Sequence, residues 1–311
     1  MTVLPDEDEG ESVELEEREV DDATYDRFDC TVDDQDAIAE AVDAARRVVE
    51  DGECIVLPTD TVYGIGADAF SADAVQGLLN AKNRGRDMPP PVLIGDASLV
   101  RALASDVPDQ ARELVEAHWP GPLTIVCRIQ PSLRMDLGDT DGTIALRVPD
   151  HALAREILRR TGPLAVSSAN LSGRPAALTC DEAVEQLDDR VSVYLDGGPL
   201  GSVAEGVDGP DAAGARQALP STIVDFTRRD DGQLLRRGAL SLETLREVLP
   251  GLADLEEPPA ARAVSRPEDV PPEQPEVAEQ PEQPEQLEES GPQPAAPPQP
   301  DEPRIEPEPT P

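Results

Sequence analysis

The chain's only lysine stands in a short cationic segment whose spacing could suit phosphate chemistry. Lys82, Arg84 and Arg86 occupy alternate positions in AKNRGRDMPPPV (81–92), within a chain that has 65 acidic residues. Alternate side chains share a face where the backbone is extended, and the prolines after Met88 favour extension. Such a row would suit a polyphosphate, because arginine gives forked hydrogen bonds and lysine gives a compact point charge. The alternative is a solvated loop.

A second polar segment follows the apolar run PLAVS. In SSANLSG (167–173), Ser168, Asn170 and Ser172 alternate before a glycine. A buried strand that ends in hydroxyl and amide groups is typical of a site at the carboxyl edge of an α/β sheet. These groups could bind phosphate, ribose or base. The alternative is a polar turn whose side chains bond to their own backbone.

Arg147 lies within TIALRVP, a run that otherwise reads as a buried strand. A buried cation needs a carboxylate or another anion, so the position predicts either an internal salt bridge or a bound anion.

PTDTVYGIGADAF (58–70) contains G-x-G-x-x-A, but its polar PTDT insert and the lack of an acidic residue about 20 positions further on argue against a dinucleotide site. The chain has no Walker A sequence, which excludes a P-loop enzyme.

Alternating helix and strand patterns predict the scaffold for these residues. Apolar spacing indicates helices at 34–50, 71–82 (capped by Ser71), 108–118, 151–161, 180–188 and 241–249. Short apolar runs indicate strands at 54–58, 91–95, 122–129, 143–149, 163–167, 191–196 and 221–226. This order predicts an α/β domain with a largely buried sheet, and residues 201–219 read as a long loop.

Charge divides the chain into three parts. Of its 65 acidic and 26 basic residues, 1–36 hold 16 and 2, and 257–311 hold 14 and 3. We expect a disordered acidic extension at 1–30, a globular domain at 31–256, and a disordered Pro/Glu/Gln-rich acidic tail at 257–311. A high content of acidic residues with a single lysine predicts a salt-rich cytosol. At about 1 M salt the Debye length is about 3 Å, so the repulsion between surface carboxylates is screened.

Several other classes of protein are not expected. The start MTVLPDEDEG does not resemble a signal peptide and no run is long enough to cross a membrane, so a cytoplasmic protein is predicted. The four cysteines form no CxxC pair and there are two histidines, which argues against a zinc site. Cys54 and Cys127 lie in apolar runs, where a small buried hydrophobe is expected.

Six segments, in order and spacing, resemble the YrdC/Sua5 family. They are PTDTVYGIGADAF, AKNRGRDMP, HWPGPLT, ALRVPDH, SSANLSG and STIVDF, and the likeness covers residues 36–250. It implies a twisted open mixed α/β sheet with flanking helices around a large, locally positive cavity. It also implies an L-threonylcarbamoyladenylate synthase, a nucleotidyltransferase that joins L-threonine, bicarbonate and ATP and releases pyrophosphate. The product supplies t6A at position 37 of tRNAs that read ANN codons. The polar tail suggests the single-domain form, and the composition suggests a halophilic archaeon.

The resemblance also assigns roles to residues of this chain. It places Lys82, Arg84, Ser168 and Asn170 around the nucleotide phosphates as the catalytic set. Further ATP contacts fall on Thr143 and Arg236, and threonine contacts fall on Thr61, Arg147, Ser221 and the backbone of Val166. Mg²⁺ would travel with ATP, and the product would pass to a Kae1/TsaD-type tRNA threonylcarbamoyl transferase.

Some positions depart from the family pattern. Leu93 and Met88 stand where many members have histidine and asparagine, RRG (236–238) replaces RPG, and LPST (219–222) replaces a Glu-Ser-Thr sequence. Two other functions stay open. One is a YrdC-like RNA-binding protein without synthase activity, with weak double-stranded RNA or tRNA binding. The other is a carbamoyl-transfer domain like those of hydrogenase-maturation proteins.

Overall fold

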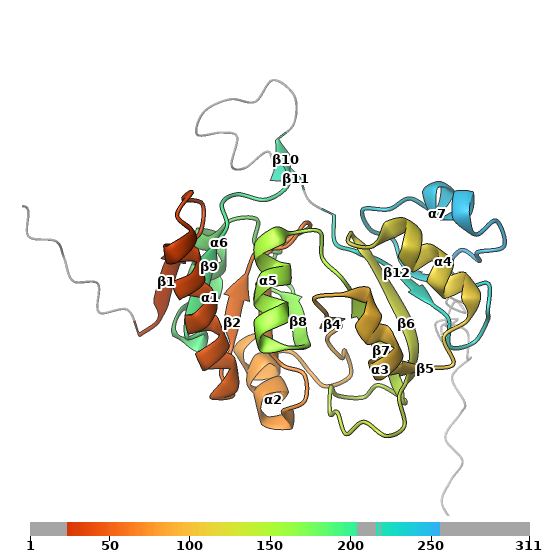
Figure 1. Cartoon of the computed structure of the whole chain (residues 1–311), viewed down its shortest axis with the longest axis horizontal. Coiled ribbons are helices and arrows are strands. Elements are labelled where there is room, and N and C mark those ends of the chain that lie inside the picture. The colour runs from red at the N-terminus through yellow and green to blue at the C-terminus, as the bar shows by residue number, and fades with distance from the viewer. Residues whose placement is uncertain (1–23, 204–215, 218, 256–311) are drawn as a thin grey trace, which may run out of the picture. The chain divides into compact units, whose positions relative to one another are not determined.

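One mixed sheet organises the chain. The computed structural model describes residues 24–203, 216–217 and 219–255, and the strands of the main sheet follow the order β1-β9-β2-β3-β8-β4-β7-β6-β12-β13, with β5 beside β6 (Figure 1). The strands are β1 (Asp26–Asp29), β2 (Ile55–Leu57), β3 (Gly64–Asp68), β4 (Val92–Leu93), β5 (Ala104–Ser105), β6 (Leu123–Ile129), β7 (Thr143–Arg147), β8 (Leu164–Ser168), β9 (Val193–Asp196), β12 (Thr222–Asp225) and β13 (Gln233–Arg236). A separate pair is formed by β10 (Ser202–Val203) and β11 (Arg216–Gln217).

Helices lie between most of these strands. They are α1 (Gln35–Glu50), α2 (Ala72–Ala81), α3 (Val100–Leu103), α4 (Asp109–His118), α5 (Ala152–Thr161), α6 (Cys180–Leu187) and α7 (Leu242–Val248), with 3-10 turns η1 (Ala97–Leu99) and η2 (Asp188–Arg190). Figure 1 shows α1 and α5 side by side in front of the strands around β2 and β8. The sheet contains both kinds of strand pairing. The pairs β2–β3, β6–β7 and β12–β13 are antiparallel, whereas β4–β7 and β6–β12 are parallel.

Strand alternation splits the buried side chains between the two faces. In β2, Ile55 and Leu57 join the cluster under α1 and α5, whereas Val56 joins the larger cluster that includes α2, α4, α6 and α7. In β9, Val193 and Leu195 pack with the first cluster and Tyr194 packs with the second. Successive strand residues point to opposite faces, so short apolar runs with both faces covered are buried throughout.

The central strand β3 has glycines where a neighbouring strand's side chains cross it. A Cβ at Gly64 would lie 2.6 Å from Val166 Cγ1, and one at Gly66 would lie 3.4 Å from Leu57 Cδ2 and 3.4 Å from Leu164 Cδ1. A glycine in a strand often marks such a close approach. Gly64 and Val166 both line the cavity described below.

Most predicted elements are confirmed, with bounds shifted by a few residues. Ser71 caps α2 by accepting a hydrogen bond from Ala74 N at 3.2 Å. The prediction that residues 1–30 form a disordered extension is wrong for 26–29, because β1 pairs in parallel with β9 as the edge of the sheet. Residues 1–23 and the predicted tail at 257–311 lie outside the described residues.

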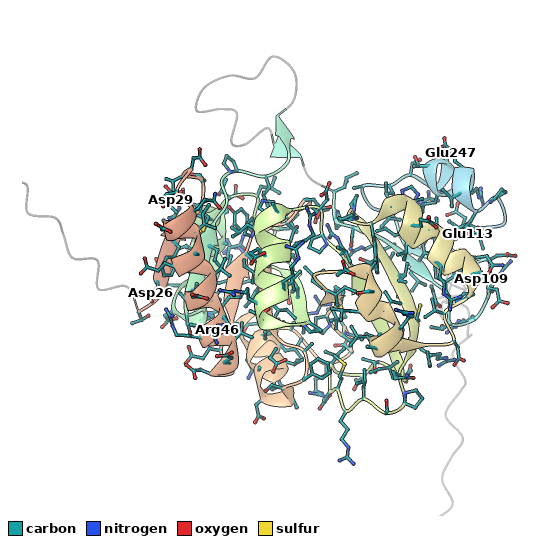
Figure 2. All side chains as sticks on the ribbon, viewed as in Figure 1. Asp26, Asp29, Arg46, Asp109, Glu113 and Glu247 are labelled. Atoms are coloured by element: carbon teal, nitrogen blue, oxygen red, sulfur yellow. The ribbon has the colours of Figure 1, made fainter. Side chains whose placement is uncertain are left out.

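The surface of the described residues is rich in carboxylates. Asp26, Asp29, Asp109, Glu113 and Glu247 lie at the periphery of the molecule (Figure 2).

Within the described residues, no helix is both long and apolar enough to cross a membrane. Cys54, Cys127 and Cys180 are buried free thiols and Cys30 is half-buried, and burial raises the pKa of the Cys54 thiol to about 12.

Candidate functional site

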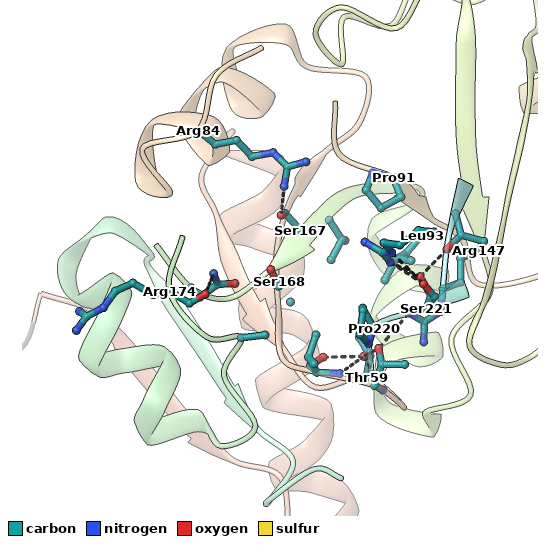
Figure 3. A pocket seen from close by; sticks show the side chains of 18 residues that line it. Thr59, Arg84, Pro91, Leu93, Arg147, Ser167, Ser168, Arg174, Pro220 and Ser221 are labelled. Carbon is teal, nitrogen blue, oxygen red and sulfur yellow. Dashed lines mark hydrogen bonds between the residues drawn. The ribbon is translucent and has the colours of Figure 1, made fainter. Parts of the chain in front are cut away.

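A cavity of about 340 Å³ opens over the neighbouring strands β3, β8, β4, β7 and β6 (Figure 3). Its walls also include the β2–β3 loop, the α2–β4 segment, the turn after β8 and residues beside β12. The lining residues are Thr59, Thr61, Val62, Gly64, Arg84, Pro91, Leu93, Thr124, Arg147, Val166, Ser167, Ser168, Asn170, Arg174, Ala176, Pro220, Ser221 and Arg236. Of the predicted site residues, all line it except Lys82 and Thr143.

The charges of the lining side chains are all positive. Arg84, Arg147, Arg174 and Arg236 line the cavity, and none of the described lining residues is acidic. The guanidinium of Arg174 extends from the rim away from Ser168 (Figure 3). A walled space with one sign of charge concentrates ligands of the opposite sign, so this cavity is suited to anions.

Arg84 reaches the cavity from the segment after α2. Its Nε donates to Met88 O at 2.8 Å, and one terminal nitrogen donates to Ser167 Oγ at 2.9 Å (Figure 3). Burial lowers the pKa of its guanidinium, although arginine stays charged at any physiological pH. Both partners are neutral, so its positive charge is not offset by a bonded carboxylate.

Arg236, at the end of β13, extends toward the residues before β12. Its Nε and one terminal nitrogen donate to Ser221 O at 3.1 and 2.8 Å, and the same terminal nitrogen donates to Ser221 Oγ at 3.0 Å. Ser221 Oγ also lies 2.8 Å from Thr124 Oγ1. Burial, followed by the charges of Arg147 and Arg84, lowers the pKa of Arg236. Three guanidinium groups are therefore close enough to repel one another across one cavity.

Arg147 ends β7 and is held on three sides. Its Nε donates to Gly121 O at 3.0 Å, one terminal nitrogen donates to Thr61 Oγ1 at 3.1 Å, and the other donates to Asp60 Oδ1 at 2.5 Å. Arg147 is 6 % exposed. Burial lowers its pKa, and the Asp60 carboxylate acts in the opposite direction. The predicted internal salt bridge is confirmed; the arginine also faces the cavity, and a bound anion at this place stays a prediction.

Lys82 is the C-cap residue of α2 and its side chain is buried, 1 % exposed. Its Nζ donates to Ser168 O and, at 2.5 Å, to Asn170 O. Its backbone O accepts from Ser172 N at 2.9 Å. Burial, followed by the charge of Arg84, lowers the pKa of this amine to about 7. In this structure the lysine fastens the turn after β8 to the end of α2 and does not line the cavity.

The predicted row of three cations is wrong. The chain turns after α2, because Asn83 has a left-handed φ of 53°, so the three side chains do not share an extended face. Lys82 points inward, Arg84 faces the cavity, and Arg86 pairs at the surface with Asp136. The prediction failed because it assumed that the prolines would extend the chain from residue 82 onward.

The turn after β8 combines both predicted alternatives. Ser168 lines the cavity at the end of the strand. Asn170 also lines it, but its Nδ2 donates to Leu171 O and Arg174 O, each at 2.8 Å. The asparagine therefore shapes its own turn, as expected of a self-bonded polar loop, while the serine stands at the cavity wall.

Thr143 is not brought together with the other predicted ATP contacts. It begins β7, its Oγ1 donates to Thr140 O at 2.7 Å, and Arg147 ends the same strand. Four residue steps in an extended strand cover about 13 Å, which places Thr143 at the far end of β7 from Arg147, a predicted threonine contact. Among the predicted ATP contacts, Arg84, Ser168, Asn170 and Arg236 line the cavity and Thr143 does not. Val166 does line the cavity, and its backbone N donates to Pro91 O at 2.8 Å.

Sequence reasoning missed Asp60, Thr59 and Thr124. Thr59 Oγ1 accepts from Thr61 N at 3.1 Å and Val62 N at 3.2 Å, which folds the PTDT segment into a tight turn beside the cavity. The sequence shows Asp60 between two threonines after a predicted strand, but it does not show that Arg147 is the ion-pair partner of this residue. Thr124 lies within an apolar strand and carried no signal.

Comparisons with known proteins agree with this architecture. The family model Sua5_yciO_yrdC, described as telomere recombination, matches residues 47–238. A Mycobacterium tuberculosis protein named "Putative threonylcarbamoyl-AMP synthase" is 46% identical over 222 residues, covering 71% of this chain and 94% of that protein. The threonylcarbamoyl-AMP synthase of Bacillus subtilis is 35% identical over 225 residues, covering 69% of this chain and 60% of the relative.

Solved structures show the same fold. The crystal structure of P. abyssi Sua5 complexed with L-threonine has a TM-score of 0.62 and 28% identity, covering 74% of this chain and 62% of that chain. E. coli YciO matches with a TM-score of 0.58 at 21% identity, covering 71% of this chain and 98% of that chain, a likeness of fold alone. The matched model spans more than half of the chain and the mycobacterial relative is covered almost fully, so the chain belongs to the Sua5/YciO/YrdC family.

Proposed function

We propose that this chain is a threonylcarbamoyl-AMP synthase, which forms threonylcarbamoyl-AMP from L-threonine, bicarbonate and ATP and releases pyrophosphate. The observation that carries the proposal is the convergence of Arg84, Arg147 and Arg236 on one cavity that also presents hydroxyls of Thr61 and Ser168. Relatives named for this activity, at 46% and 35% identity, support it. A related Sua5 structure complexed with L-threonine supports the choice of amino acid.

The chemistry requires anions to approach one another. The amine of threonine combines with bicarbonate to give N-carboxythreonine and water. A carboxylate oxygen of that intermediate then attacks the α-phosphorus of ATP, and the bond to the departing pyrophosphate breaks. Positive groups that are fixed before reaction lower the cost of bringing these charges together. Arg84 and Arg236, which are not hydrogen-bonded to any carboxylate, are suited to the phosphates, and Arg147 is suited to the amino-acid carboxylate.

We propose that Mg²⁺ enters with ATP, held by phosphate oxygens, since this ion prefers oxygen ligands and keeps several of its waters. Within the described residues, no group of three or more His, Cys, Asp or Glu side chains is arranged to hold a metal ion. When bound, the ion would offset phosphate charge, and the arginines would orient the chain of phosphates beside it.

The product is a mixed anhydride that water can hydrolyse, so we propose transfer to an enzyme of the Kae1/TsaD type that modifies tRNA at t6A37. We place the protein in the cytoplasm with these partners. A salt-rich archaeal cytosol and the single-domain form stay predictions from the composition and the tail. The net charge of −14 for residues 37–256 opposes broad contact between this protein and the phosphate backbone of an RNA.

The test is product analysis with the full chain at high salt. We expect pyrophosphate release that depends on both threonine and bicarbonate, and a nucleotide product whose mass equals that of threonylcarbamoyl-AMP. Arg160→Met removes a surface partner of Asp43 outside the cavity, and this control variant should release pyrophosphate at the rate of the parent. Pyrophosphate release that does not respond to threonine would refute the proposal.

A further inference from the structure

The arginines of the cavity differ in what they are bonded to. Arg84 donates to a serine hydroxyl and a backbone oxygen, and Arg236 donates to the oxygens of Ser221. Arg147 alone among the described lining arginines forms a salt bridge with a carboxylate, that of Asp60. One region of the cavity wall therefore holds guanidinium groups without a bonded carboxylate, and another holds a guanidinium that is paired with one.

Asp60 is placed tightly beside Arg147. The Thr59 side chain closes the turn on either side of it, and Asp60 Oδ1 lies 2.5 Å from the guanidinium. The other carboxylate oxygen, Oδ2, is buried and has no hydrogen-bond partner within the described residues. The Asp60 side chain is 13% exposed and that of Arg147 is 7% exposed. An acceptor left unpaired in a buried place is costly, which points to a role other than packing.

We propose that Asp60 is a specificity-determining residue that makes the Arg147 end of the cavity select a zwitterion, an amino acid with both its groups charged, over a simple anion. This inference rests on the proposed function. The Asp60 carboxylate offsets part of the guanidinium charge, so the pair attracts phosphate, pyrophosphate or bicarbonate less than an arginine without a bonded carboxylate would. An amino acid gains from both members, because its carboxylate meets the guanidinium while its ammonium lies in the field of the adjacent carboxylate.

This arrangement would keep the phosphates of ATP and the amino acid at different ends of the cavity. The cavity must admit ATP and an amino acid at once, and a third unbalanced arginine would let phosphates occupy the amino-acid end. Two unit charges a few ångströms apart at an effective dielectric near 20 interact strongly enough to change affinity by more than about tenfold. The balanced pair therefore divides one positive cavity into an anion end and a zwitterion end.

The experiment compares binding of L-threonine with 3-hydroxybutyrate, which keeps the carboxylate and hydroxyl but lacks the amine. Calorimetry is done on the parent, on Asp60→Asn and on Asp43→Asn, which removes an arginine-paired carboxylate at the surface. Asp60→Asn keeps an oxygen for Arg147 but removes the charge. We expect the preference for threonine over 3-hydroxybutyrate to fall at least about tenfold in Asp60→Asn and to be unchanged in Asp43→Asn.

Competition by inorganic pyrophosphate gives a second readout that a merely structural role would not move. Pyrophosphate should not displace threonine from the parent but should displace it from Asp60→Asn. If the parent already shows such competition, or if the variant keeps the full preference, the inference is wrong. If circular dichroism shows that Asp60→Asn does not fold, competition by pyrophosphate in the parent would still overturn the inference.

Failure of the proposed function has a different signature. A parent that binds no threonine contradicts the synthase assignment. The role of Asp60 is then read from a set of other amino acids and their deaminated analogues on the same variants. Loss of preference for the amine in Asp60→Asn would support the inference, and an unchanged preference would overturn it.

Discussion

Replacing the buried lysine should change how stability depends on pH. Lys82→Met keeps an unbranched chain of similar length and removes the amine that donates to Ser168 O and Asn170 O. The pKa of this amine falls from its ordinary 10.5 to about 7 on folding, chiefly through burial. The folded protein therefore holds the charged form at a cost that the unfolded chain does not bear.

The direction and size of this change in the free energy of unfolding follow from the difference in proton binding between the folded and unfolded chain. Between the folded and unfolded pKa values the unfolded chain binds more protons, so this amine makes the parent more stable as pH rises from about 7 to 10.5. The destabilisation is largest below pH 7 and disappears above 10.5. With 1.36 kcal/mol per pKa unit, the parent should gain about 3 kcal/mol over Lys82→Met between pH 7 and pH 9.5.

Urea denaturation of both proteins at these two pH values measures the difference directly. Subtracting the variant removes the contributions of cysteines and tyrosines that titrate in the same range. Arg46→Met, on the exposed part of α1 where Arg46 pairs with Glu50, is the matched control and should show a flat difference. A parent–variant difference for Lys82→Met that is also flat with pH would refute the reasoning about the buried amine.

Four further outcomes are expected. Lys82→Arg should lower threonine-dependent pyrophosphate release, because a flat guanidinium cannot reproduce the bonds of the amine to the turn, and turnover equal to the parent would contradict this. Arg84→Ala, which removes a cation from the cavity wall, should lower the same release about 10²–10³-fold while circular dichroism stays unchanged. Gly64→Ala should cost about 1–3 kcal/mol in urea unfolding, since its Cβ would lie 2.6 Å from Val166 Cγ1. Valine should release far less pyrophosphate than threonine, because a site that bonds a hydroxyl discriminates against an analogue that lacks it.

The tail prediction can be tested in the same assay. A chain that ends at Glu257 keeps every described element of the fold and should retain synthase turnover at the parent's level. The physical reason is that the Pro/Glu/Gln-rich composition of 257–311 offers too little apolar surface to pack against the domain. Circular dichroism is the folding control, and loss of turnover in a folded truncated chain would show that the tail contributes to the activity.

The scaffold was predictable because its signals are local. Strands β2, β8 and β9 are short apolar runs, and α1 and α2 have polar caps followed by apolar residues at helical spacing. The edge strand β1 was missed because DRFD is mostly charged. Its pairing with β9 depends on Tyr194 and its neighbours more than 160 residues away, and no local pattern contains that information.

The site was predictable by residue type but not by direction. The resemblance to the family placed Lys82 and Arg84 with Ser168, yet one left-handed residue, Asn83, sends the lysine inward and the arginine to the cavity. The two cations therefore have different tasks in this structure. Lys82 binds backbone oxygens at the end of β8 and in the turn after it, and Arg84 bonds to the side chain of Ser167 within β8. An arginine at 82 would have to fit a fork into a space that now holds a single amine among carbonyls, which is a physical reason why an otherwise lysine-free chain has a lysine there.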